Sequence, residues 1–126
     1  MTKSWDATTL AAIDTADDLK ISPLRDDNVT HGTPTWIWCV VLDGELYVRP
    51  YYGSRSRWYA AALARPEGRI HAAGAVYEVT YEPADPALAD QIDGAYTRKY
   101  APSPYLPAML APSPRECAIR LVPKES

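Results

Sequence analysis

The apolar positions along the chain fall into blocks whose spacing predicts helix, strand, strand, helix, strand, strand, helix, strand, in that order. Leu10 and Ile13 stand at helical spacing in the first block, SWDATTLAAIDTADDLKI. Ser4 or Asp6 precedes them, and either side chain can accept a hydrogen bond from the free amides of a first helical turn. We therefore expect a short N-terminal helix, followed by a loop that begins at Pro23.

A β-hairpin is predicted in the next block, TPTWIWCVVLDGELYVRPYY. Its Asp43-Gly44 pair stands between two runs rich in β-branched and aromatic residues, and such a pair favours a two-residue turn. Side chains alternate along a strand, which gives one face Trp36, Trp38 and Val40 and the other face Ile37, Cys39 and Val41. Because both faces are apolar, the hairpin must be covered on both sides or curl into a barrel.

The second half of the chain repeats the same kinds of element. We expect an alanine-rich helix in RSRWYAAALARPEG, ended by Pro66 and Gly68, and a second hairpin in RIHAAGAVYEVTYEPAD with its turn at Ala73-Gly74. A further helix is expected in PALADQIDGAYTRKYA and a last strand in ECAIRLVP. Five of the twelve prolines stand in PSPYLPAMLAPSP, which therefore predicts neither a long helix nor a central strand.

This order of elements predicts a mainly β fold of the α+β class, a small antiparallel barrel with peripheral helices, whose mouth the ordered proline-rich segment crosses. A length of 126 residues suits one domain with a buried core. We divide the single domain 1–126 into a helix and loop at 1–31, the barrel core at 32–85, a helix with the proline-rich excursion at 86–115, and the last strand at 116–123.

Charge and composition argue against several classes of protein. The net charge of -3 and the pI of 5.3 disfavour a protein that coats nucleic acid or anionic lipid, because such proteins need a basic surface. No stretch approaches the ~20 apolar residues of a membrane span, and the first block lacks the apolar core of a signal peptide. We therefore expect a cytoplasmic protein without nucleic-acid or membrane partners. Cys39 and Cys117 stand far apart without a CxxC motif, which predicts buried free thiols and no metal site.

The stretch RPYYGSRSRWYAAAL carries the most basic cluster of this acidic chain. A Gly-Ser loop before a helix leaves backbone amides unpaired at the positive end of that helix, which suits an anion. Arg55 and Arg57 can add charge-assisted hydrogen bonds, and Arg49 can reach the same anion from the preceding strand. The alternative is that Ser54 or Ser56 is an ordinary N-cap and the arginines are solvated.

The aromatic residues are nine tyrosines and four tryptophans, with no phenylalanine. Almost every ring thus carries a polar group, as is common in a ligand cavity, although core tryptophans of a small barrel satisfy the same observation. The predicted ligand-pocket residues are Tyr51, Tyr52, Tyr59, Tyr96, Tyr100 and Tyr105. His31 and His71 have no carboxylate or cysteine partner nearby in the sequence, and we assign no catalytic residue.

The stretch from GTPTWIW to YEPAD, residues 32–85, resembles the core of the flavin- and deazaflavin-dependent nitroreductase-like split β-barrels of the pyridoxamine-phosphate-oxidase-like superfamily. Residues 116–122 agree more loosely, and the whole chain is most similar to a bacterial branch described as a domain of unknown function. The resemblance implies a split barrel in which a cofactor phosphate is held by Arg49, Ser54, Arg55 and Arg57, with Trp58 beside it. It implies a flavin ring stacked along Thr35, Trp36 and Trp38.

Two hypotheses follow for the function. The first is an oxidoreductase-like protein that binds FMN or a deazaflavin and acts on a small organic molecule, with the cofactor supplying the chemistry. The second is a split barrel without a cofactor that binds a small anionic or aromatic ligand, as an accessory protein or a non-redox enzyme. Since both faces of TWIWCVVL are apolar, we also expect a homodimer.

Overall fold

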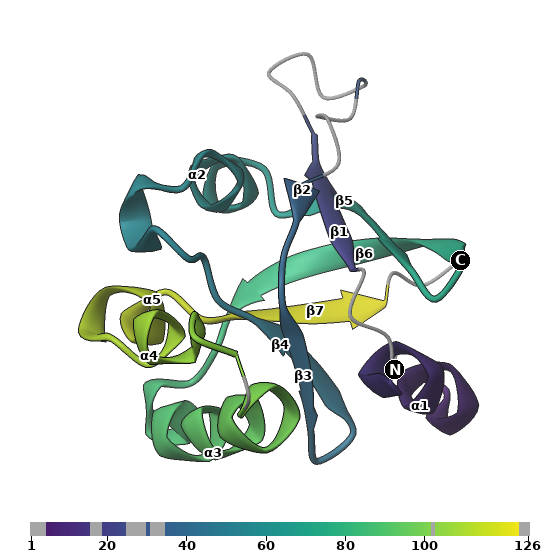
Figure 1. Cartoon of the computed structure of the whole chain (residues 1–126). Helices are drawn as coiled ribbons and strands as arrows, with labels where there is room; N and C mark the ends of the chain where they lie inside the picture. The colour runs from purple at the N-terminus through teal and green to yellow at the C-terminus, as the bar shows by residue number, and fades with distance from the viewer. Residues whose placement is uncertain (1–4, 16–18, 25–29, 31–34, 102, 124–126) are drawn as a thin grey trace.

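A computed structural model of the chain describes residues 5–15, 19–24, 30, 35–101 and 103–123. Within these residues an antiparallel seven-stranded sheet has the order β2-β1-β5-β6-β7-β4-β3. The sheet curls into a half-barrel, and the helices lie around it (Figure 1). The predicted α+β, mainly β class with an antiparallel barrel-like sheet and peripheral helices is confirmed.

The strands run in chain order as β1 (Lys20–Pro23), β2 (Thr35–Trp36), β3 (Cys39–Leu42), β4 (Glu45–Val48), β5 (Glu67–Ala72), β6 (Ala75–Pro83) and β7 (Ile119–Pro123). The α-helices are α1 (Ala7–Thr15), α2 (Arg57–Ala64), α3 (Ala89–Tyr100), α4 (Leu106–Met109) and α5 (Pro112–Glu116). Two short 3-10 helices, η1 (Gly53–Arg55) and η2 (Pro86–Leu88), precede α2 and α3.

One continuous segment forms both edges of the sheet. β2 pairs with β1 and β3 pairs with β4, although only Ile37 and Trp38 separate the two strands in the chain. Ile37 continues the first pairing, since its amide donates to the carbonyl of Leu19 at 3.0 Å. The sequence predicted one unbroken strand here, which is wrong, because the segment leaves one edge and joins the other. We call residues 37–38 the barrel split.

Both predicted hairpin turns are confirmed. Asp43 and Gly44 have φ of 52° and 78°, and Ala73 and Gly74 have φ of 50° and 79°. Two successive left-handed residues give a turn whose twist matches that of the flanking strands. The turns fix the register of the β3–β4 and β5–β6 pairs.

Two apolar cores receive the side chains that alternate between the two faces of β3 and of the residues before it. Ile37 and Cys39 pack in the larger core together with α1, α2 and the strands, whereas Val40 packs in the smaller core under α3 and α4. Trp38 borders that smaller core. The prediction that both faces are covered is therefore confirmed, and Trp36, which is 60% exposed, is the position that departs from it.

Some element boundaries differ from the predictions. Asp6 caps α1, since its carboxylate accepts from the amide of Thr9 at 3.1 Å, while the alternative cap Ser4 lies outside the described residues. The first helix ends at Thr15, and Lys20–Pro23 forms a strand where a helix end and a loop were expected. Tertiary pairing decides this, because β1 pairs with both β2 and β5.

Glycine and proline also act differently from expectation at the helix ends. Gly68 does not end α2 but lies in β5, where a Cβ would stand 2.5 Å from the Tyr81 hydroxyl. The proline-rich segment forms two short helices, α4 and α5, each with a proline at its first turn, where the missing amide hydrogen costs nothing. No long helix and no strand forms among its described residues, as predicted.

Several wider expectations can be compared with the structure. Cys39 and Cys117 are buried free thiols, as predicted. Among the described residues no group of three or more His, Cys, Asp or Glu side chains could hold a metal ion. No helix in that part of the chain has the length and apolar character needed to cross a membrane. The domain boundaries, the homodimer and the cytoplasmic location stay predictions.

Candidate functional site

An open cleft of about 220 Å³ lies at the barrel split. Its lining consists mainly of aromatic side chains, namely Trp36, Trp38, Tyr51, Tyr52 and Tyr105, with Ile37, Arg49 and Met109. We call it the aromatic cleft. All five aromatic residues were predicted to bind a cofactor or a ligand, and the structure brings them together from β2, the barrel split, the segment after β4 and the start of α4.

The rings at the rim of the aromatic cleft are unusually exposed for their size. Trp36, Tyr52 and Tyr105 are 60%, 66% and 61% exposed. Tyr51 holds the group together, since its ring meets Tyr52 edge to face at 5.1 Å and Tyr105 at 6.5 Å. Exposed aromatic surface of this extent is typical of binding surfaces, because water solvates it poorly. The arrangement suits a flat ligand that can stack on, or insert between, these rings.

Helix α3 supports the wall of the aromatic cleft from behind. Trp38 stacks on Tyr100 with ring centroids 4.0 Å apart and planes inclined by 4°. The Tyr100 hydroxyl accepts from the amide of Cys39 at 3.2 Å and donates to its carbonyl at 3.1 Å, while the Tyr96 hydroxyl donates to the carbonyl of Trp38 at 3.2 Å. Burial raises the pKa of Tyr96 well above its usual value, so this donor stays protonated. The two tyrosines thus satisfy main-chain groups where the strand is broken.

Replacing Tyr100 by phenylalanine is expected to lower the free energy of unfolding by about 1–3 kcal/mol, because the buried amide of Cys39 then loses its partner. The measurement is urea denaturation followed by tryptophan fluorescence. Tyr105→Phe is the matched control, since Tyr105 is exposed and the change should stay within about 0.5 kcal/mol. Equal stability of the two variants would contradict the role given to the Tyr100 hydroxyl.

Arg49 also lines the aromatic cleft and is fully buried. Its Nη1 donates to Asp93 Oδ1 at 2.6 Å and to the carbonyl of Met109 at 3.1 Å, and its Nη2 donates to the carbonyl of Ala89 at 3.1 Å. The guanidinium also lies 5.4 Å from the centre of the Tyr96 ring. Arg49 therefore joins β4 to α3 and α4, and among the described residues only its Nε has no hydrogen-bond partner. Its role as a phosphate ligand stays a prediction.

A second cation extends this ion pair toward the surface. Arg115 of α5 donates from Nε to Asp93 Oδ2 at 2.9 Å and also pairs with Asp90. The hydrogen bond to Asp93, and then the negative charge of Asp93, raise the pKa of Arg115 above its usual value. Asp93 thus links a buried and a half-exposed arginine, which ties three elements together behind the aromatic cleft.

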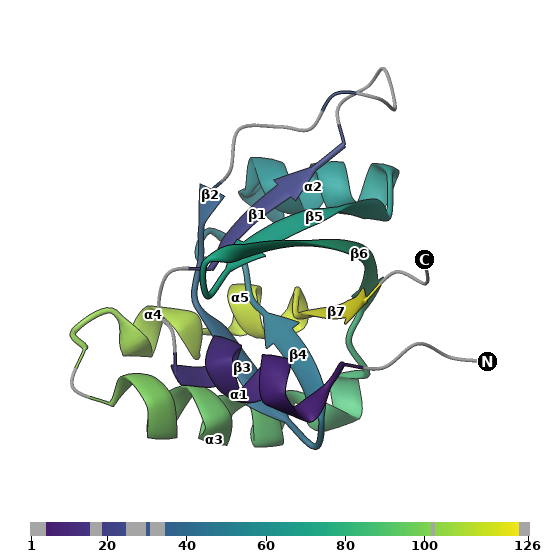
Figure 2. The same cartoon turned by 90° about the vertical axis from the view of Figure 1, so that its right-hand side faces the viewer.

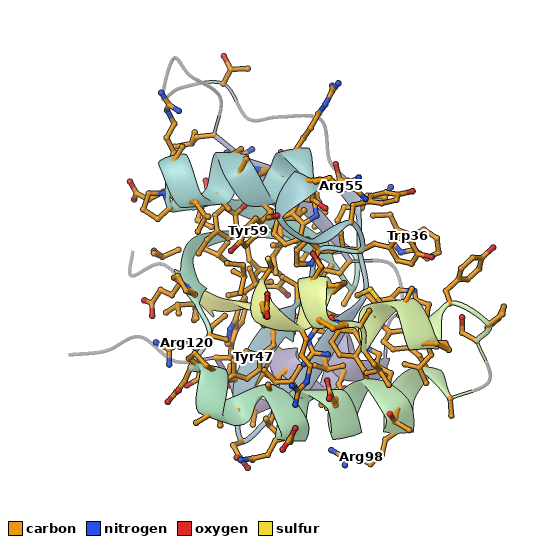
Figure 3. All side chains as sticks on the ribbon, turned by 90° about the vertical axis from the view of Figure 1, so that its left-hand side faces the viewer. Trp36, Tyr47, Arg55, Tyr59, Arg98 and Arg120 are labelled. Carbon is orange, nitrogen blue, oxygen red and sulfur yellow. The ribbon has the colours of Figure 1, made fainter. Side chains whose placement is uncertain are left out.

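The predicted phosphate loop is basic, with Ser54, Arg55 and Arg57 exposed and Gly53 and Ser56 buried. Gly53 has a φ of 62° and lies tightly against α5, where a Cβ would stand 1.7 Å from Ser113 Oγ. Arg55 and Arg57 point to solvent, and neither has an ion-pair partner within the part of the chain that the structure describes. Figure 3 shows Arg55 on the same side of the molecule as Trp36.

The start of α2 adds backbone donors to this loop. Ser56 occupies the N-cap position of α2 but makes no side-chain cap hydrogen bond. Ser56 is therefore the N-cap residue, as the alternative interpretation expected. Its hydroxyl, however, does not make the hydrogen bond that is usual for an N-cap. The N-cap side chain thus leaves the first amides of α2 without a cap hydrogen bond, which is an arrangement that water or an anion can satisfy.

Other predicted site residues do not line the aromatic cleft. Trp58 is buried in the larger core, and Tyr59 packs against it edge to face at 6.2 Å. Burial first, and then a hydrogen bond with Cys117, raise the pKa of Tyr59. Tyr96 and Tyr100 stand behind Trp38, and Thr35 is exposed in β2. Their predicted contacts with a ligand are not tested by the structure.

Sequence reasoning missed the acidic partner of Arg49. The run LYVRP places an arginine at the end of an apolar strand, and a buried arginine is rarely unpaired, so a carboxylate partner could have been sought. Asp93 lies 44 positions away, and nothing local points to it. Met109, which also lines the aromatic cleft, stands in the segment predicted to cross the barrel mouth.

Comparison with known proteins gives three findings. Residues 9–121 match the model of a protein family described as "uncharacterized protein conserved in bacteria (DUF2255)". No curated protein matches the sequence. The crystal structure of an FAD-binding protein from Mesorhizobium loti is similar, with a TM-score of 0.58 and 15% identity over 99% of this chain and 94% of that chain. At this identity the likeness shows a shared fold.

Proposed function

The chain belongs to this bacterial family, DUF2255. We propose that it binds a flavin or deazaflavin in the aromatic cleft and acts as an oxidoreductase on a small organic molecule. The observation that carries the proposal is the group of exposed rings around the barrel split. The similar fold of the FAD-binding protein from Mesorhizobium loti supports it, and so does the resemblance to flavin-dependent split barrels. Fold alone does not assign an activity, so the site must carry the argument.

The aromatic cleft has room for the ring system of such a cofactor, but not for the whole cofactor. Pockets that enclose a drug-sized ligand measure ~300–1,000 Å³. A cleft of about 220 Å³ holds one flat ring system and leaves the phosphate-bearing chain outside. Arg55 and Arg57, exposed at the start of α2, would then hold the phosphate. When bound, the flavin would supply hydride transfer, which no side chain of the site provides.

The side chains would orient the ring and set its electrostatic surroundings. Trp36, just before the barrel split, and Trp38 within it offer aromatic rings to the ligand, and the stack on Tyr100 fixes the position of Trp38. The buried guanidinium of Arg49 places a positive charge beneath the aromatic cleft, partly balanced by Asp93. A fixed cation at that position favours a ring that carries or gains negative charge.

The test is a titration of the purified protein with FMN, FAD and a deazaflavin, read by the fluorescence of the added cofactor. We expect saturable binding of at least one of the three, with an affinity about tenfold weaker in Trp36→Ala, because one stacked ring contributes ~1–3 kcal/mol. Leu63→Ala is the matched control, since Leu63 is exposed on α2 and does not line the aromatic cleft. No saturable binding, or equal affinity in Trp36→Ala, would contradict the proposal.

The alternative without a cofactor is favoured by the saturation of Arg49 and by the small volume of the aromatic cleft. The guanidinium of Arg49 already donates three hydrogen bonds to protein groups, which leaves few donors for a phosphate. The cleft would then take a small aromatic anion as a whole. Titration with benzoate in the same assay, with tryptophan fluorescence as the signal, separates the two functions, because only this alternative predicts binding of benzoate without binding of any flavin.

A further inference from the structure

A second open groove lies on another part of the surface, over the outer edge of β3. It measures about 240 Å³ and shares no lining residue with the aromatic cleft. Its lining residues are Asp14, Val40, Val41, Ala95, Arg98 and Lys99. Helices α1 and α3 stand on opposite sides of the β3–β4 hairpin (Figure 1), and the view in Figure 2 shows α1 lying across this hairpin above α3. We call it the edge groove.

The main chain of β3 offers the edge groove a hydrogen-bonding pair. The two-residue turn makes Leu42 and Glu45 a hydrogen-bonded pair, so the amide and carbonyl groups of Val41 and Cys39 point away from β4. Those of Cys39 bind Tyr100 and Lys99 of α3. Those of Val41 have no hydrogen-bond partner within the described part of the chain. One donor and one acceptor therefore face the edge groove.

Opposite charges stand on the two walls of the edge groove. Asp14 is exposed on α1, and Arg98 is exposed on α3. No ion pair joins these walls among the residues that the structure describes, since neither Asp14 nor Arg98 has a partner there. Lys99 donates to the carbonyl of Cys39 at 3.0 Å and to its Sγ at 3.6 Å, which leaves one of its three ammonium hydrogens for another acceptor.

We propose that the edge groove binds a small zwitterion of the α-amino-acid type. Its carboxylate would accept from Arg98, Lys99 and the amide of Val41, and its ammonium group would donate to Asp14 and the carbonyl of Val41. A ligand with both charges bridges walls that do not pair with each other. The volume of the groove limits the side chain of the ligand to a few atoms, which would contact Val40 and Ala95. This binding is separate from the proposed binding of a flavin.

The experiment uses the full chain labelled with nitrogen-15, and it follows the amide resonance of Val41 during titration with L-alanine. A saturable shift is expected below about 10 mM alanine. Acetate and methylammonium, which each carry one of the two charges, should bind at least about tenfold more weakly, because each loses one set of charge-assisted hydrogen bonds. Asp14→Asn and Arg98→Gln should each weaken the binding of alanine about tenfold for the same reason.

Lys20→Gln is the matched control, since Lys20 is an exposed cation on β1 that does not line the edge groove. The affinity of this variant for alanine should equal that of the unchanged protein. Asp14 and Arg98 are both exposed, so their replacement leaves the cores intact. The absence of a saturable shift would overturn the proposal. It would also be overturned if acetate bound as tightly as alanine, or if neither groove variant changed the affinity.

Discussion

Replacing Arg49 by alanine is expected to lower the free energy of unfolding by about 3–5 kcal/mol, which is a large part of the stability of a domain of this size. The side chain is fully buried, and its removal leaves Asp93 and the carbonyls of Ala89 and Met109 without this donor. The carbonyl of Met109 and one oxygen of Asp93 then lose a hydrogen bond in a largely buried site, while Asp93 keeps its hydrogen bond from Arg115. Urea denaturation at neutral pH, followed by circular dichroism, measures the effect.

Arg115→Ala provides the matched control for Arg49→Ala. Arg115 binds the other oxygen of the same carboxylate but lies partly in solvent, so water can replace it and the loss should be much smaller. A loss for Arg49→Ala as small as that for Arg115→Ala would show that Arg49 does not hold α3 and α4 to β4. Arg49→Lys should fall between the two, because an ammonium group keeps the charge but not the planar fork.

The second large effect is expected at Gly53, where alanine should cost about 2–4 kcal/mol. A left-handed φ of 62° accounts for ~1–2 kcal/mol of strain in a residue with a Cβ. The remainder comes from overpacking, because the new methyl group would stand 1.7 Å from Ser113 Oγ and 2.8 Å from its Cβ. The shift of η1 away from α5 should also weaken ligand binding, since Tyr51 and Tyr52 directly precede this turn. Thermal unfolding measures the stability term.

Gly44→Ala separates the two causes at Gly53. Gly44 has a φ of 78°, and a Cβ there would meet nothing within 4 Å, so only the backbone strain of ~1–2 kcal/mol should appear. Ser113→Gly in the Gly53→Ala background removes both side-chain atoms of the close contact. It should therefore recover the part of the stability that was lost to overpacking. If Gly53→Ala and Gly44→Ala destabilise the protein equally, the contact with α5 has no energetic weight.

Local patterns predicted those parts of the fold that local chemistry determines. The Asp43-Gly44 and Ala73-Gly74 turns, helix α2 and helix α3 follow from turn residues and apolar spacing, and the structure has them in place. β1 was missed because its four residues gain their order from β2 and β5, which are distant in the chain. The break at residues 37–38 was missed for a similar reason, since an uninterrupted β-rich run does not reveal that it changes partners.

The candidate site shows the same division. Aromatic residues close together in the sequence favoured a ligand pocket, and the structure gathers four of them with Tyr105 of the proline-rich segment at the aromatic cleft. The sequence could not indicate that Arg49 turns inward, because that depends on Asp93 in a helix that folds back over β4. It could not indicate the edge groove either, since Asp14 and Arg98 lie on different helices and more than 80 positions apart in the chain.

The capping of β3 by side chains of α3 has a consequence for the solubility of the protein. An edge strand with a free row of amides and carbonyls can recruit a strand from another molecule and start an aggregate. Tyr100 and Lys99 occupy the outward groups of Cys39, so among the residues that the structure describes only the outward groups of Val41 have no partner along the four residues of β3. A second strand needs several successive pairs to add to a sheet. The end of α3 therefore shields the β3 edge of the sheet from intermolecular pairing.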